Sequence, residues 1–173
     1  MTEFSRPFAL ETIGDAPRTV SIEATPGECA ALAARFGLAA VQSLSAKAKL
    51  EAQGDAYLAT GHIAGSVIQL CIATDEPVPA LVNERFEIRF VSPQHAPDAD
   101  EIELASDDCD MMEHDGQSLD LGEAAAQTLA LALDPFPRAA NADAILAQAG
   151  VVGDDEAVTG PFAGLKGMLG TAR

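Results

Sequence analysis

Residues 85–90 read Arg-Phe-Glu-Ile-Arg-Phe, so charged and apolar side chains alternate along the stretch. A period of two predicts a β-strand with one face buried and the other in water. Upstream, residues 67–72 contain a second apolar row, made of Ile68, Leu70 and Ile72. We therefore expect these two stretches to form the arms of a β-hairpin. The two prolines in residues 74–79 favour a loop between them, because proline opposes a central strand.

The chain before this hairpin shows the same alternation. Residues 19–24 and 43–51 each place apolar side chains on one face, and residues 57–63 follow a turn at 53–55. Together with the hairpin, residues 43–51 and 57–63 predict an antiparallel meander of about four strands. Gly65 lies inside this region, and we interpret it as a bulge or bend.

Two stretches have the composition of helix N-termini. Thr25, Pro26 and Glu28 fit the N-cap, N1 and N3 positions of a helix that ends at Gly37. Asp120 and Glu123 fit the N-cap and N3 positions of a second helix, which stops before Pro135.

The predicted fold class is α+β: an antiparallel β-meander or partly closed sheet, two packed helices and an acidic loop. Residues 1–137 are expected to form a single domain. Residues 138–173 are expected to form a C-terminal tail, partly disordered or folded on a partner, with a short helix near residues 143–149.

Charge is the most unusual property of the chain. The formal net charge is −17, and residues 90–137 contain no Lys or Arg but twelve of the 27 acidic residues. A dense negative strip attracts Lys/Arg-rich proteins and speeds their encounter, although it can also be only a solvated loop. The candidate partner-binding residues are Asp98, Asp100, Glu101, Glu103, Asp107, Asp108 and Asp110.

The ten basic residues are few, and four of them alternate with other residues on two predicted strands. Lys47, Lys49, Arg85 and Arg89 form a small basic strand face or, as is more common, the ordinary wet face of a sheet. With ten bases against 27 acids, we expect contact with RNA to be at most indirect. DNA and membranes are not expected as partners.

The side chains capable of catalysis are scattered. Three cysteines make no disulfide framework, and Cys29 and Cys71 are expected to be small buried hydrophobes, Cys71 in mid-strand. Cys109 with His114, or a pair of carboxylates, leaves open a small hydrolase. No spacing indicates a zinc or calcium site, and no cofactor is expected. The first residues lack the pattern of a targeting segment, which favours a cytoplasmic location.

The order of these motifs resembles that of a known family. A Leu70-Cys71 strand end is followed by a proline-containing loop, the strand at residues 86–90, the acidic stretch, a Leu-Asp-Leu helix start at 119–121 and Leu-Ala-Leu-Asp-Pro at 131–135. This order resembles the YceD family, the large ribosomal RNA subunit accumulation proteins of bacteria and plastids, over about residues 5–137. Residues 161–166, Pro-Phe-Ala-Gly-Leu-Lys, also look like the C-terminal ending of that family.

The chain departs from the family at the strand end. The family pattern there is Cys-x-Arg-Cys, whereas residues 71–74 read Cys-Ile-Ala-Thr, and residues 138–141 replace the cysteine-rich stretch of some members. If paired cysteines bind a metal in other members, this chain cannot bind one in that way.

The resemblance implies a non-enzymatic factor that aids the accumulation of large-subunit ribosomal RNA and ribosome assembly. We expect the acidic strip to engage a basic ribosomal protein or a large-subunit assembly particle. The alternatives are the small cytoplasmic hydrolase and an interaction domain unrelated to ribosomes.

Overall fold

The computed structural model describes residues 3–93 and 110–151. Six of the predicted partner-binding acids, the predicted strand near residues 101–104 and the last 22 residues lie outside these ranges. In chain order the elements are β1 (Pro7–Ala9), η1 (Leu10–Thr12), β2 (Arg18–Glu23), α1 (Pro26–Phe36), β3 (Ala40–Gln53), β4 (Ala56–Leu70), β5 (Pro77–Val91), β6 (Asp110–Glu113), β7 (Ser118–Asp120), α2 (Leu121–Ala132) and α3 (Ala142–Gln148).

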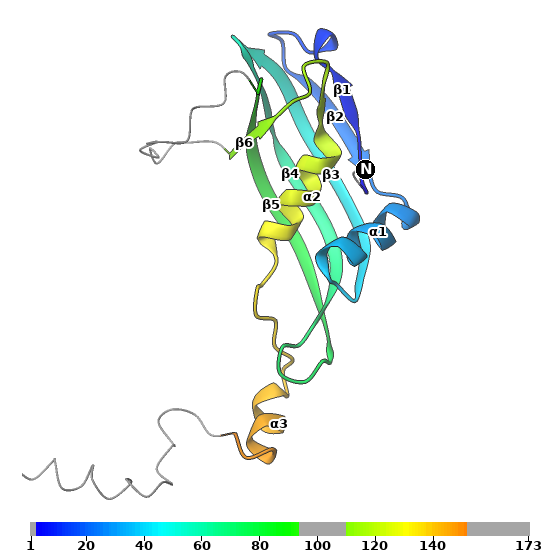
Figure 1. The fold of residues 1–173 in the computed structure, drawn as a ribbon, viewed down its shortest axis with the longest axis vertical. Helices are drawn as coiled ribbons and strands as arrows, with labels where there is room; N and C mark the ends of the chain where they lie inside the picture. The colour runs from blue at the N-terminus through cyan, green and yellow to red at the C-terminus, as the bar shows by residue number, and fades with distance from the viewer. Residues whose placement is uncertain (1–2, 94–109, 152–173) are drawn as a thin grey trace, which may run out of the picture.

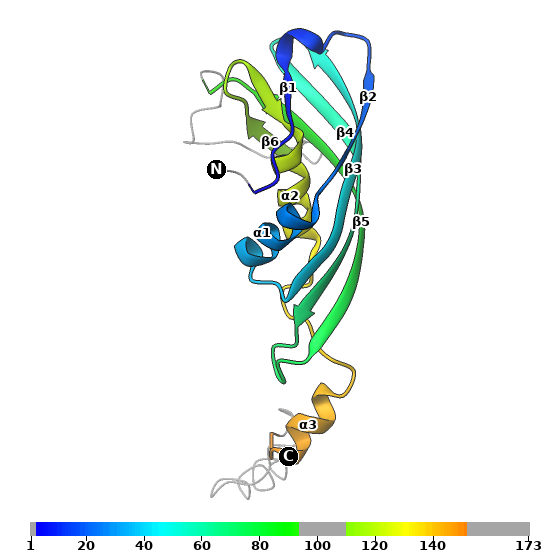
Figure 2. The ribbon, with the colours of Figure 1, turned by 90° about the vertical axis from the view of Figure 1, so that its right-hand side faces the viewer.

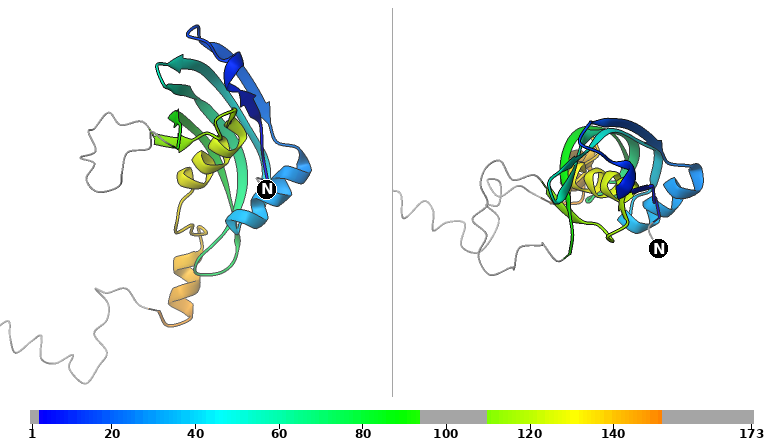
Figure 3. Two further views of the ribbon diagram at one scale, coloured as in Figure 1. Left: turned by 45° about the horizontal axis from the view of Figure 1, so that its top comes forward. Right: turned by 90° about the horizontal axis from the view of Figure 1, so that it is seen from above.

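A five-stranded sheet in the order β2-β3-β4-β5-β6 carries the fold, and β1 pairs with β7 in a small second sheet (Figure 1). The predicted meander is confirmed in part: β2 to β5 are antiparallel neighbours, but the strands predicted separately at residues 57–63 and 67–72 form the single strand β4. Strand β6 is parallel to β5, so the sheet is mixed. The sheet curves around α2 (Figure 3). The sequence predicted a meander or a partly closed sheet, but the sheet is open, since β2 and β6 lie at its opposite edges.

The predicted hairpin exists, but its register was wrong. Residues 85–90 pair with residues 57–62, and residues 67–70 pair with residues 77–80. Ile68, Leu70 and Ile72 do not face the core as predicted: Leu70 and Ile72 are 44% and 58% exposed. The buried row is instead Val67, Gln69 and Cys71. The buried Gln69 amide is satisfied because it donates to the carbonyl of Asp134 at 2.8 Å.

The prolines do not interrupt β5, contrary to the sequence interpretation. Pro77 and Pro79 are strand residues that pair with Leu70 and Ile68 on β4. They are tolerated because β6 pairs only with residues 88–91, so this end of β5 is an edge of the sheet. On its open side no described strand needs a hydrogen bond from a proline N–H.

The bulge also lies elsewhere. The register shift falls between Val41 and Ser43 on β3, and Gly65 pairs regularly with Leu44. A Cβ added to Gly65 would lie 3.4 Å from Leu129 Cδ1, so Gly65 marks the close approach of α2 to the sheet.

Both long helices lie on one face of the sheet (Figure 2). Helix α1 packs on β3, whereas α2 packs on β4 and β5. The predicted capping box of α1 is confirmed, and Gly37 ends this helix with φ +64°. The buried layer between helices and sheet includes Phe4, Leu32, Leu44, Leu50, Ile63, Val67, Phe90, Leu119, Leu121 and Leu129.

The carboxylate of Asp120 joins the start of the chain to α2. It accepts from the N–H groups of Gly122 and Glu123, which caps the helix as predicted. It also accepts from Ser5 Oγ at 2.6 Å and from the Arg6 N–H at 2.7 Å. The peptide of Arg6 completes the connection, because its carbonyl accepts from the Leu121 N–H at 3.1 Å.

Arg6 extends this connection to α1. Its guanidinium donates to both carboxylate oxygens of Glu28, at 2.6 and 2.9 Å. This contact is the main reason that the pKa of Glu28 falls to about 2. Glu123 does not complete a capping box on α2; its carboxylate binds Arg35 of α1 at 2.7 Å. The two helices are therefore linked by side chains at two points.

Two glycines at the second position of a helix form a matched pair for a stability test. A Cβ on Gly122 would lie 2.5 Å from the carbonyl oxygen of Phe4, whereas a Cβ on Gly27 would meet nothing within 4 Å. We expect Gly122→Ala to lower the free energy of unfolding by roughly 1–3 kcal/mol, because the Phe4 backbone must move. Gly27→Ala is expected to leave it unchanged or raise it by up to about 1 kcal/mol. Urea denaturation of both variants measures the difference, and equal effects would contradict this account of the Phe4–α2 contact.

Candidate functional site

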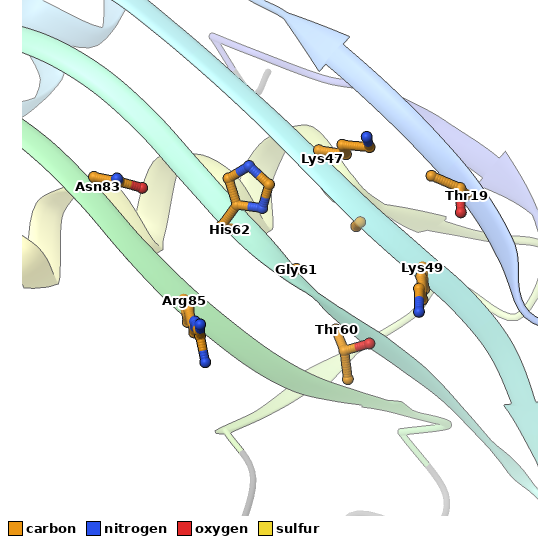
Figure 4. Close-up of a pocket in the computed structure, with 9 residues that line it drawn as sticks. Thr19, Lys47, Lys49, Thr60, Gly61, His62, Asn83 and Arg85 are labelled. Carbon is orange, nitrogen blue, oxygen red and sulfur yellow. The ribbon is translucent and has the colours of Figure 1, made fainter.

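The outer face of the sheet, opposite the helices, carries a row of basic side chains. Strand pairing sets Lys47 of β3 beside His62 of β4, and His62 beside Arg85 of β5. All three side chains are exposed. Figure 4 shows them on three neighbouring strands, with Lys49 further along β3. We call Lys47, Lys49, His62 and Arg85 the basic row.

The basic row borders a shallow depression of about 850 Å³. Beside the basic side chains lie polar groups that can donate hydrogen bonds, from Thr19, Thr60 and Asn83 (Figure 4). No Phe, Tyr or Trp side chain is among the lining residues. The surface is therefore suited to an anion held by charge and hydrogen bonds rather than by stacking.

The cations of this face differ in their ion pairing from three other arginines of the fold. Arg6, Arg35 and Arg138 each form an ion pair with a neighbouring carboxylate. Within residues 3–93 and 110–151, Lys47, Lys49 and Arg85 take part in no such pair. Arg89, which the sequence placed on the same strand face, is also exposed and outside these pairs. The alternation therefore produces a basic surface on this face.

Of the predicted acidic strip, the structure describes Asp110 alone. Asp110 begins β6, where it is exposed and pairs in register with Ile88 at the sheet edge. Asp98, Asp100, Glu101, Glu103, Asp107 and Asp108 lie outside the described residues. Glu113, the last residue of β6, adds an exposed carboxylate to this edge.

The turn after β6 is built by polar side chains. Asp115 accepts from the N–H groups of Gln117 and Ser118, at 2.8 and 2.6 Å, and these bonds lower its pKa. His114 is buried, its Nδ1 accepts from the Gly116 N–H at 3.0 Å, and its ring packs edge-on against Tyr57. These contacts assign His114 a structural role in the turn. Its predicted partner in a hydrolase, Cys109, lies outside the described residues.

Cys29 and Cys71 are both buried, as predicted, but their thiols differ. Burial raises the pKa of Cys29. Cys71 lies just beyond the end of β4 rather than in mid-strand. Hydrogen bonds from the Ala139 N–H and the Thr74 side chain lower its pKa to about 7. The lowered pKa of Cys71 was not predicted from the sequence, because Ala139 is distant along the chain and an alanine gives no sign of this contact.

The residues after α2 pack beside the β4–β5 loop. The Ile72 N–H donates to the Pro137 carbonyl at 3.0 Å, and the Asn141 amide donates to Glu76 at 3.2 Å. Helix α3 follows, close to its predicted position.

Large apolar side chains remain exposed near this end of the molecule. Leu131 is 81% exposed on the last turn of α2, and Phe136 is 68% exposed just after it. Leu131 therefore lies on the surface of the described structure rather than in its core. Leu81, on the outer face of β5, is 87% exposed.

The described residues contain neither a metal-binding cluster nor a membrane-spanning helix. In residues 3–93 and 110–151, no group of three or more His, Cys, Asp or Glu side chains is placed to hold a metal ion. In the same part of the chain, no helix has the length and apolar character needed to span a membrane.

Comparison with known proteins returned no match to a family model, to a curated protein or to a solved structure.

The Thr74 hydroxyl tests the origin of the Cys71 pKa. We expect Thr74→Val to raise this pKa from about 7 toward 9, because the thiolate loses a donor. The thiolate contribution to stability is full above pH 9 and is lost as the pH falls through about 7. Thr74→Val should reduce this pH dependence without abolishing it, because the Ala139 N–H still donates to the thiolate. Ultraviolet thiolate absorbance measures the pKa in a background of Cys29→Ala and Cys109→Ala. Thr74→Ser, which keeps the hydroxyl, is the control; an unchanged pKa in Thr74→Val would contradict the assignment.

Proposed function

We propose that this protein is a non-enzymatic cytoplasmic factor that aids large-subunit ribosomal RNA accumulation and ribosome assembly by binding a basic ribosomal protein. The observation that carries the proposal is the order of motifs from Leu70 to Pro135 that resembles the YceD family. The caps and strand ends among these motifs have clear structural roles in this fold: Asp120 caps α2, and Cys71 closes the β4–β5 loop.

Charge supports a basic partner. The formal net charge of −17 gives a protein of this size a strong negative field, which accelerates encounter with a Lys/Arg-rich protein. The acidic strip leads directly into β6, the edge strand of the sheet, where Asp110 and Glu113 are exposed. An edge strand also has unpaired backbone groups that a bound segment can use.

The described side chains favour binding over catalysis. His114 is committed to a turn and to Tyr57, and the thiol with a lowered pKa, Cys71, is fully buried. A nucleophile must reach its substrate, so neither group is placed as an accessible catalyst.

An interaction domain unrelated to ribosomes is the second candidate. It is favoured by the exposure of Leu131 and Phe136, because large apolar side chains at neighbouring chain positions are typical of protein contact sites. Such a contact would weaken little as salt rises, in contrast to an acidic interface.

Reversal of the acidic strip tests the proposal. We expect the protein, used as bait in a cell lysate, to retain large-subunit proteins or assembly particles at low salt and to release them at high salt. Changing Asp98, Asp100, Asp107 and Asp108 to Lys should reduce this recovery at least about tenfold, equivalent to about 1.4 kcal/mol.

The matched control changes Glu11, Asp15, Asp55 and Glu84 to Lys. These exposed acids lie in described positions outside residues 98–110, and their reversal alters the net charge by the same amount. The control should keep its partners. Undiminished recovery by the strip variant would disprove the acidic mechanism, and no ribosomal component at either salt would set aside the ribosomal role.

A further inference from the structure

We propose that the outer face of the sheet binds the phosphate backbone of RNA directly, through the basic row. The ribosomal identity of that RNA rests on the proposed function, whereas the binding site rests on the described side chains. The inference revises the expectation, drawn from net charge, that RNA contact is at most indirect.

The register of β3, β4 and β5 places the cations of the basic row at fixed spacings. Because Lys47, His62 and Arg85 stand level on adjacent strands, their Cα atoms are separated by about 5 Å from strand to strand. Lys49 lies two residues further along β3, or about 7 Å away. A paired sheet holds these positions rigidly, so several donors can meet phosphate groups of one strand without first being ordered. Preorganisation of this kind reduces the entropy lost on binding.

The charges of the basic row are available to bind a phosphate. Arg6, Arg35 and Arg138 are already bound to carboxylates, so their charges are used within the fold. In the described part of the chain, the cations of the basic row have no such partners. Phosphate contacts in nucleic-acid complexes come from Lys and Arg together with Ser, Thr and Asn side chains. Here Thr19, Thr60 and Asn83 line the same depression as the cations.

The acids on this face limit the affinity but do not occupy the row. Glu87 stands level with Thr60 on β5, and Glu23 and Glu51 lie near the ends of β2 and β3. More distant carboxylates are screened beyond about 8 Å at physiological ionic strength. We therefore expect weak binding, near the 10⁻⁴ M end of the range of about 10⁻⁴–10⁻⁶ M for non-specific complexes.

RNA backbone fits this face better than an acidic polypeptide. Every nucleotide carries a charged phosphate with several acceptor oxygens, which matches closely spaced cations and hydroxyl donors. Because the lining of the depression contains no Phe, Tyr or Trp, we expect backbone contact with little base stacking, and hence little sequence preference.

Fluorescence anisotropy with a short labelled single-stranded RNA of mixed sequence tests the inference on the full-length protein. Three phosphate contacts predict a slope of log K against log salt of about −2, at about −0.7 per contact. The Lys47→Gln/Arg85→Gln variant should bind about tenfold more weakly and bring the slope to about −0.7. The Lys47→Arg/Arg85→Lys variant should retain binding, because it keeps both charges.

The control variant is Arg18→Gln/Arg138→Gln, which removes the same charge elsewhere. Arg18 pairs with the buried Leu50 and so belongs to the opposite face of the sheet. This variant should bind RNA within about twofold of the unmodified protein, because distant charges are screened. Thermal unfolding of each variant confirms that the sheet is intact.

Three results would overturn the inference: no RNA binding at low salt, equal losses in the row and control variants, or competition by polyglutamate as strong as by RNA at equal charge. Capture of a basic ribosomal protein by the same sample would then leave the proposed function standing. RNA binding without capture of a basic ribosomal protein would instead retain this site and reject the acidic interface.

Discussion

The fold depends on one carboxylate. Asp120 caps α2 through Oδ1, which also accepts from the Arg6 N–H, while Oδ2 accepts from the Ser5 hydroxyl. Arg6 then reaches Glu28 in the capping box of α1. The start of the chain, the first helix and the second helix are thus tied by charge-assisted hydrogen bonds, which are stronger than neutral ones. Loss of this carboxylate would remove hydrogen-bond partners from the start of the chain and from α2 together.

This arrangement leaves the two faces of the sheet with different tasks. The inner face is covered by α1, α2 and the N-terminal segment, so its side chains form the core (Figure 2). None of the described helices lies over the outer face, which carries the basic row (Figure 4). The exposed acids of β6 lie at one sheet edge. A strongly acidic chain therefore presents a local surface of opposite sign, which net charge alone conceals.

Local patterns predicted local structure well. The Thr25 capping box, the left-handed Gly37, the Asp120 cap and the strand alternation at residues 43–51 all needed only near neighbours in sequence. Prediction was wrong for the apolar row at residues 68–72, because either face of that stretch looks acceptable alone. Gln69 faces the core since Asp134, far along the chain, supplies its acceptor. The position of β6 beside β5 likewise has no local signal.

The sequence by itself determined the strands of the meander, the helix ends and the unusual charge, because capping, alternation and composition act over a few residues. Only the tertiary structure decided the hairpin register, the open edges of the sheet and the double use of Asp120. It also decided that Lys47, His62 and Arg85 stand level. These features require pairing between distant segments, and such pairing is selected by the packing of the whole core rather than by any short stretch.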